Sequence, residues 1–130
     1  MIQLDTHSLL WLESEYEKLS PSARAAIEAS VLAGERIAIS AITLWEITLL
    51  ARRKRILANV SIQSFLMDLE ENYRVVPVIG TIAFLAAELP ASFPKDPMDR
   101  LIAATAIVEN LTLITADRDI LASQVCKVLW

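Results

Sequence analysis

The 130-residue sequence contains few of the residues that build disulfides or zinc sites, with one cysteine and one histidine. The lone Cys126 excludes a disulfide framework, and we expect it to be a buried structural thiol. No apolar stretch reaches the ~18 residues that a membrane-spanning helix needs, and Glu35 and Arg36 interrupt the most apolar region. The first residues lack a basic leader and a small-residue cleavage site, so we expect a cytoplasmic protein without a signal peptide.

Positive charge is also scarce. The chain has 12 Lys and Arg against 16 Asp and Glu, which gives a formal net charge of −4. Proteins that bind nucleic acids are usually basic, because phosphate neutralisation supplies most of their affinity. The balance by itself argues against such a role. A cluster of metal-binding carboxylates would produce the same excess, because divalent cations invert the local charge.

Apolar residues, by contrast, are abundant. They make up 55% of the chain, and the mean hydropathy is +0.45, which is high for a chain of this size. We expect another chain, either a second copy or a dedicated partner, to cover part of the surface. The alternative is a well-filled core with buried helices.

Short apolar runs alternate with longer helical patterns along the chain. The runs predict strands at residues 2–4, 37–39, 75–78, 111–115 and 125–129. The longer patterns predict helices near residues 9–12, 21–34, 41–53, 61–69, 81–89, 98–109 and 117–122. This alternation predicts one domain over residues 1–130, a three-layer α/β/α sandwich with a central parallel sheet of about five strands. In such sheets the functional crevice lies beyond the carboxyl ends of the strands.

Two aspartates follow predicted strands. Asp5 comes directly after residues 2–4, and one residue separates Asp117 from residues 111–115. If both strands are central and parallel, the two carboxylates approach each other at one edge of the sheet. The alternative is that each aspartate simply caps the helix that follows it.

Glu46 lies on a predicted helix among apolar neighbours such as Ile42 and Leu50. Burying a carboxylate there is costly unless it is paired or metal-bound. A Glu–Arg ion pair or a position at the rim of the core would also explain it.

The segment from Lys95 to Arg100 contains two acids. Asp96 precedes Pro97 and is predicted to cap the next helix. Asp99 shares a helix face with Ile102 and Ala103, so it is predicted to point inward, although an acid there could also close a capping box.

Converging carboxylates repel each other and need a compensating charge. Oxygen ligands suit Mg²⁺ or Mn²⁺ rather than zinc. Phosphoryl transfer is the chemistry that uses carboxylate-held Mg²⁺. We assign no catalytic role to His7, because a lone histidine near a helix start is more often a local hydrogen-bonding group.

With these positions identified, the sequence resembles PIN-domain proteins, and most of all the ribonuclease toxins of the VapC type. Four segments carry the resemblance, in the family's order and with its usual spacing. They are LDTHSLLWL at 4–12, ISAITLWEI at 39–47, DPMDRLIAATA at 96–106 and LTLITADRDI at 111–120.

The resemblance implies a Mg²⁺- or Mn²⁺-dependent endoribonuclease with a PIN-like fold. The catalytic acids it implies are Asp5, Glu46, Asp99 and Asp117, with Asp5, Asp99 and Asp117 as metal ligands. The supporting residues are Thr6, Asp96 and Thr115, whose hydroxyl matches one that orients the acidic cluster. Asp119 is a second acid close to Asp117, and the sequence leaves open which of the two faces the metal.

Members of this kind usually form homodimers and are inhibited by a small VapB-like antitoxin. The antitoxin's C-terminal segment lies along a hydrophobic groove and reaches the acidic pocket. Trp11, Trp45 and Phe65 are candidates to line that groove, or are plain core residues. The basic residues Arg52, Arg53, Lys54 and Arg55 form either a phosphate-contacting patch for the RNA substrate or a solvated helix end.

Other functions require different sequence features. An aspartyl phosphatase of the haloacid-dehalogenase type needs a second Asp two positions after the first, where this chain has His7. A receiver-like signalling domain needs an acidic pair where Asp5 stands alone. A non-catalytic binding module does not explain Glu46 on its apolar stripe. A PIN-fold nuclease that acts in RNA processing without an antitoxin remains an alternative.

Overall fold

Five short parallel strands form one sheet in the order β3-β2-β1-β4-β5. The computed structural model describes residues 1–53 and 59–130. The strands are β1 (Ile2–Leu4), β2 (Ala38–Ser40), β3 (Arg74–Val76), β4 (Thr112–Ile114) and β5 (Val128–Leu129). In the centre, Leu4 of β1 is in register with Ile39 of β2 and Ile114 of β4. The predicted five-stranded parallel sheet is confirmed.

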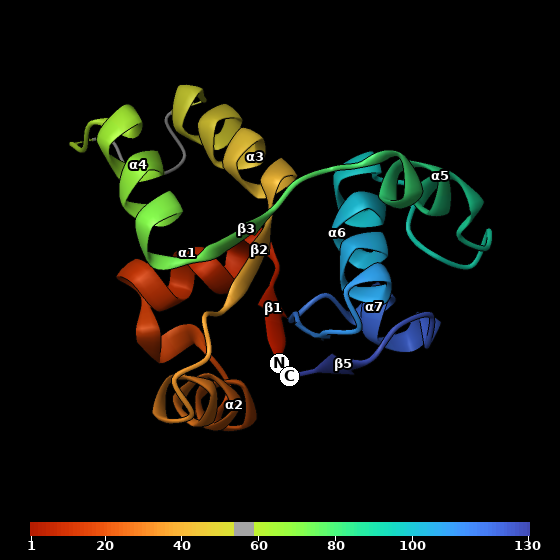
Figure 1. The fold of residues 1–130 in the computed structure, drawn as a ribbon, viewed down its shortest axis with the longest axis horizontal. Coiled ribbons are helices and arrows are strands. Elements are labelled where there is room, and N and C mark those ends of the chain that lie inside the picture. Colours follow the sequence, from red (N-terminus) through yellow and green to blue (C-terminus); the bar gives the residue numbers. More distant parts are fainter. Residues whose placement is uncertain (54–58) are drawn as a thin grey trace.

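Helices cover both faces of the sheet, as the alternating pattern predicted (Figure 1). They are α1 (Thr6–Ser14), α2 (Pro21–Leu32), α3 (Ala41–Arg52), α4 (Ile62–Asn72), α5 (Gly80–Glu88), α6 (Pro97–Val108) and α7 (Arg118–Ser123), with a 3-10 turn at Tyr16–Lys18. Helices α1, α2 and α4 lie on one side of the sheet, and α5, α6 and α7 lie on the other (Figure 1). Helix α3 contacts α1, α4 and α6, so it bridges the two helical layers.

Three of these helices have a serine as their N-cap. Ser20, Ser40 and Ser61 each accept a backbone N–H from the first turn that follows, which satisfies a donor without a helical partner. Gly34 has a φ of 73°, the left-handed conformation that commonly follows a helix end. These local signals explain why most predicted boundaries lie within a few residues of the observed ones.

The last strand is shorter than predicted. It spans only Val128–Leu129 because the chain bends before it. Gln124 has a φ of 53°, and the backbone N–H of Val125 donates to Ser123 Oγ instead of to a neighbouring strand. Strand β3 likewise ends at Val76, since Pro77 has no N–H to continue the ladder.

Two apolar clusters form the core, one on each face of the sheet. Ile39 and Ile114 face the cluster that α1 and α2 cover, whereas Ala38 and Leu113 face the cluster beneath α6, as strand alternation requires. Five consecutive residues of α6, 102–106, are buried, which confirms that this apolar helix is internal. Cys126 is half-buried, and burial raises the pKa of its thiol.

The core does not absorb all of the apolar residues. Large apolar side chains remain exposed on several helices and loops, among them Val31, Leu32, Trp45, Met67, Ile79 and Phe84. None of the helices in the described ranges is both long and apolar enough to cross a bilayer.

Arg100 fastens the loop between α5 and α6. Its guanidinium donates to the carbonyl oxygens of Ala86 and Leu89 at the end of α5, and to those of Phe93 and Pro94 in the loop. It also lies over the Phe93 ring, 5.9 Å from the centroid. A cation is favourable at a helix C-terminus, where carbonyls lack helical partners. One side chain therefore fixes the segment that leads into Asp96 and α6.

We predict that Arg100→Met lowers the free energy of unfolding by about 2–3 kcal/mol, because several half-buried carbonyls lose a charged donor. Arg100→Lys should recover only a minor part, since an ammonium cannot reproduce the planar fork. Urea denaturation followed by circular dichroism measures both. Arg118→Met removes the same charge from an exposed side chain and is the control. Equal losses for Arg100→Met and Arg118→Met would contradict the anchoring role.

Candidate active site

A pocket of about 370 Å³ lies beyond the carboxyl ends of the central strands. Its lining consists of Asp5, Thr6, His7, Trp11, Glu46, Asp96, Asp99, Ile102, Ala116 and Asp117. All four acids that the sequence predicted as catalytic therefore line one pocket, together with the predicted supporting residues Thr6 and Asp96. The chain leaves β1 toward β2 on one side and reaches β4 on the other, so the pocket lies at the topological switch point of the sheet.

Asp5 and Asp117 are brought together by the pairing of β1 with β4. The N–H of Asp5 donates to the carbonyl of Ile114, at 3.2 Å, which extends that pairing to the sheet edge. Asp5 Oδ1 accepts the N–H of Ser8 at 2.9 Å, and Asp117 Oδ1 accepts the N–H groups that follow it, including that of Ile120 at 3.1 Å. Both aspartates are thus helix caps and pocket residues at once. Each cap uses Oδ1, which leaves Oδ2 for the pocket.

Glu46 reaches the pocket from α3 and is held by α1. Thr6 Oγ1 donates to Glu46 Oε1 at 2.5 Å, and it lies 3.3 Å from Thr43 Oγ1. Thr6 and Thr43 are buried, whereas Glu46 is half-buried. Among the described residues no Lys or Arg forms an ion pair with Glu46, so its partner is a hydroxyl and not the alternative arginine.

Among the acids of the pocket, Asp99 is the one whose pKa is clearly raised. Burial is the largest cause that raises the pKa of its carboxyl, and the charges of Asp96, Asp117, Glu46 and Asp5 follow in that order; together they bring the pKa to about 7. Its place in the first turn of α6 favours an anion through the helix dipole, but this does not offset burial and repulsion. No Lys or Arg is among the described residues that line the pocket, so no side-chain cation there offsets this repulsion.

Asp96 lies at the rim of the pocket. It is exposed, and its Oδ1 caps α6 by accepting the N–H of Met98 at 2.8 Å. The capping predicted from its position before Pro97 is confirmed, and its charge is the largest of the charge effects that raise the pKa of Asp99.

The contacts of Thr115 and Asp119 show which of the two neighbouring acids, Asp117 or Asp119, faces the pocket. The buried Thr115 Oγ1 accepts the N–H of Asp117 at 3.1 Å, which orients this junction toward the pocket. Asp119 is exposed and lies against a separate hollow with Ser92 and Pro94. Of the two acids, Asp117 is therefore the one that faces the carboxylate pocket.

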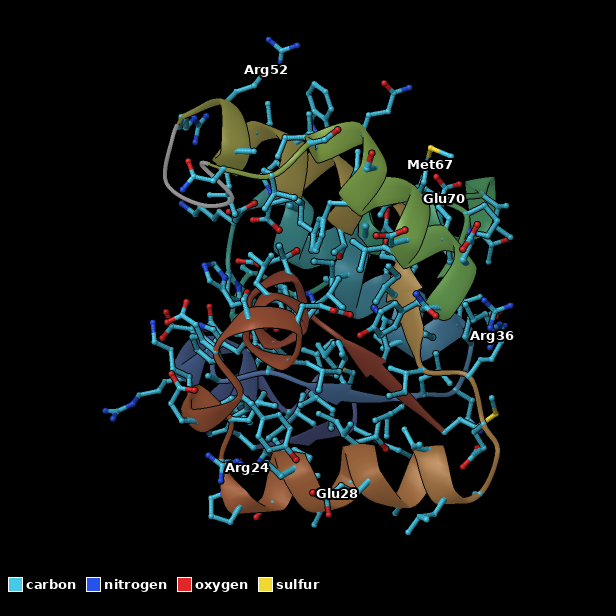
Figure 2. The ribbon with its side chains drawn as sticks, turned by 90° about the vertical axis from the view of Figure 1, so that its left-hand side faces the viewer. Arg24, Glu28, Arg36, Arg52, Met67 and Glu70 are labelled. Atoms are coloured by element: carbon cyan, nitrogen blue, oxygen red, sulfur yellow. The ribbon has the colours of Figure 1, made fainter. Side chains whose placement is uncertain are left out.

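The basic residues lie elsewhere. Arg52 and Arg53 are exposed at the end of α3 and do not line the pocket, and Arg52 points away from the body of the protein (Figure 2). Lys54 and Arg55 lie outside the described residues. A contact between this run and RNA stays a prediction.

Of the three aromatic residues proposed to line a groove, Trp45 is exposed, whereas Trp11 and Phe65 are half-buried against the core. Trp11 also lines the carboxylate pocket, as does the exposed His7. The sequence carried a signal for both, because positions 7 and 11 share one face of the helix that Asp5 caps.

The donor set fits a hard divalent cation. The side-chain donors of the pocket are mainly carboxylate and hydroxyl oxygens, which suit Mg²⁺ or Mn²⁺, and a cation would relieve the repulsion at Asp99. Within the described ranges no three His, Cys, Asp or Glu side chains already converge closely enough to hold an ion. The acids surround the pocket without meeting at one point.

We predict that Asp99→Asn stabilises the metal-free protein at high pH. The pKa of Asp99 is about 7 in the folded state and 3.8 in its ordinary state, so between these values the folded state binds the extra proton. Stability then falls as pH rises through this window, and the penalty is fully present above pH 7. In EDTA, the melting temperature gained by Asp99→Asn should be larger at pH 8 than at pH 5, by ~3 °C, or about 1 kcal/mol for a domain of this size.

Asp119→Asn removes the same charge from an exposed side chain and serves as the control. A gain for Asp99→Asn that is independent of pH would contradict the raised pKa.

Comparison with known proteins agrees with this geometry. Residues 2–127 match the PIN domain family. Ribonuclease VapC22 of Mycobacterium tuberculosis is 39% identical over 117 residues, which cover 90% of this chain and 87% of that relative.

Solved structures share the fold over nearly the full length. FitAcB from Neisseria gonorrhoeae has 26% identity and a TM-score of 0.67, covering 100% of this chain and 97% of the other. VapBC2 from Rickettsia felis, solved bound to a DNA fragment from its promoter, has 22% identity and a TM-score of 0.74, covering 100% and 99%. The chain therefore belongs to the PIN-domain family and, within it, to the VapC-type ribonucleases.

Proposed function

We propose that this protein is the toxin of a toxin–antitoxin pair and hydrolyses RNA phosphodiester bonds with Mg²⁺ or Mn²⁺ held by its acidic pocket. The observation that carries the proposal is that five carboxylates and, among the described residues, no Lys or Arg line one pocket, an arrangement in which burial and repulsion raise the pKa of Asp99. Such repulsion is costly in a structural site, and it is relieved when a divalent cation binds.

The acids of the pocket have two roles, since three would bind the metal ion and Glu46 would accept a proton. Asp5, Asp99 and Asp117 would hold the ion, and the capped pair would do so through the oxygens that do not bond to backbone N–H groups. When bound, Mg²⁺ or Mn²⁺ activates water and neutralises charge on the phosphate. Glu46, held through Oε1 by Thr6, keeps Oε2 for the pocket, where it accepts a proton from the attacking water. That water attacks phosphorus as the bond to the ribose oxygen breaks, and the leaving oxygen takes up a proton from solvent.

Exposed apolar side chains support the partner part of the proposal. Trp45 and Met67 are more than half exposed on neighbouring helices, and Met67 projects outward from α4 (Figure 2). Ile79 and Phe84 are exposed at α5. A further solved relative is described as a toxin–antitoxin complex from Klebsiella pneumoniae. We propose that a small antitoxin covers one of these surfaces and a second copy of the chain covers another.

We predict that purified protein cuts RNA with Mg²⁺ or Mn²⁺ and loses this activity in EDTA. Asp5→Asn and Asp99→Asn should each lower kcat/KM by about 100-fold or more, because each removes charge from the site where phosphate charge develops. Gel-based cleavage assays measure both effects. Asp119→Asn, outside the pocket, should retain wild-type activity.

Full activity of Asp99→Asn in a clean preparation would overturn the assigned site. Growth arrest on induced expression, relieved by the same variant, separates a toxin from a nuclease of RNA processing. Sequencing the RNA ends in those cells identifies the target.

We predict that Thr6→Val lowers cleavage about tenfold, because Glu46 loses the hydroxyl that orients it, a loss comparable to that of a hydrogen bond to a charged group. Thr6→Ser should recover most of the rate, since it restores the donor. Mn²⁺ binding, followed by calorimetry, should change much less than the rate, because Thr6 acts through Glu46. A serine variant as slow as the valine variant would show that the methyl group, and not the hydroxyl, matters.

A further inference from the structure

Two aromatic side chains, His7 and Trp11, stand in the lining of the carboxylate pocket. We propose that His7 and Trp11 form a binding site for one unpaired RNA base beside the scissile phosphate. The proposal rests on the ribonuclease function proposed above and names the state of its substrate, a single-stranded segment.

The geometry of the pair suits a stacking site. The two residues are four positions apart on α1, directly after the Asp5 cap, so they share one helix face. Their ring centroids are 6.1 Å apart, with 55° between the planes. Because the planes are tilted, a base stacks flat on one of the two rings and meets the other at an angle. His7 is exposed and Trp11 is half-buried.

Trp11 is fixed from behind by Trp130. Their ring centroids are 5.5 Å apart, with an interplanar angle of 56°, and both rings pack against the core cluster beneath α1. Trp130 does not line the pocket. A preoriented ring loses little entropy when a base stacks on it.

The described lining of the pocket offers RNA no side-chain cation, so a contact that needs no charge would add affinity. Of its ten lining residues five are acids and none is Lys or Arg. Side-chain cations therefore do not draw the RNA backbone into this pocket, and the described arginines of the only dense basic run lie at the far end of α3. Base stacking on aromatic rings does not depend on neutralising phosphates.

Stacking also selects the state of the substrate. A base inside a duplex has both faces covered, whereas an unpaired base can turn out of its strand and offer a face to an aromatic ring. The site therefore favours RNA that is single-stranded beside the cleaved bond.

The test uses a short single-stranded oligoribonucleotide that the wild-type protein cuts once, and analogues in which single bases are removed in turn. In wild type, removing the base beside the cleaved bond should lower kcat/KM about five- to 150-fold, the range measured for one stacked base. The double variant His7→Ala, Trp11→Leu should cut the intact oligonucleotide with a similar loss. It should then show no further loss with the abasic analogue.

Trp45→Ala is the matched control, because Trp45 is an exposed tryptophan on α3 outside the pocket lining. It should keep the wild-type ratio between intact and abasic substrates. His7→Ala alone covers the case in which the double variant misfolds, since His7 is exposed. His7→Ala should lower the ratio between the rates on intact and abasic substrates, while its circular dichroism spectrum stays that of wild type.

Binding without metal separates this proposal from the proposed function. In EDTA, fluorescence anisotropy of the labelled oligonucleotide should show tighter binding of the intact form than of the abasic form, and the double variant should bind both equally. If wild type cuts all abasic analogues at the intact rate, or His7→Ala keeps the wild-type ratio, the base site is overturned and the nuclease function stands. If cleavage persists in EDTA and in Asp99→Asn while wild type still distinguishes the two forms in EDTA, the metal-dependent nuclease function of this pocket fails and the base site stands.

Discussion

Mutual repulsion among half-buried carboxylates is the constraint around which this site is built. Three of the five acids in the pocket are helix caps, and each gives one oxygen to backbone N–H groups. Capping fixes the carboxylate, and the helix dipole offsets part of the cost of bringing negative charges together. Asp99 lies inside the first turn of α6 without such a cap, and it is the acid whose pKa is raised toward neutrality. The repulsion is therefore concentrated on the acid that a cation would relieve most.

The rest of the fold keeps these acids from moving apart. The β1–β4 pairing sets the separation of Asp5 from Asp117, and the Thr6 hydroxyl ties Glu46 on α3 to the start of α1. Arg100 fastens the loop before α6 to the end of α5, which fixes where Asp96 and Asp99 enter the pocket. Acidic side chains from four separate segments thus line one pocket at the sheet edge, and contacts outside the pocket hold these segments in place.

Much of this arrangement follows from local signals in the chain. Serine caps and alternating apolar patterns predicted the helices and strands to within a few residues, and the inward direction of Asp99 followed from its neighbours on α6. The two readings of Asp5 and Asp117, as caps or as pocket residues, could not be separated, because a carboxylate has two oxygens and serves both roles. The partner of Glu46 was also beyond local reasoning, since Thr6 lies 40 positions away and only the packing of α1 against α3 brings them together.

The sequence by itself determined the layered α/β architecture, because periodicity, caps and strand-end positions are properties of neighbouring residues. It proposed the candidate acids from strand-end positions together with the family resemblance. Only the tertiary structure decided that Asp117 and not Asp119 faces the pocket, since the Thr115 bond and the turn of α7 orient that junction. It also decided that His7 and Trp11 stand beside the acids. Strand order and helix packing set these relations, and they depend on contacts between distant segments, which no local pattern encodes.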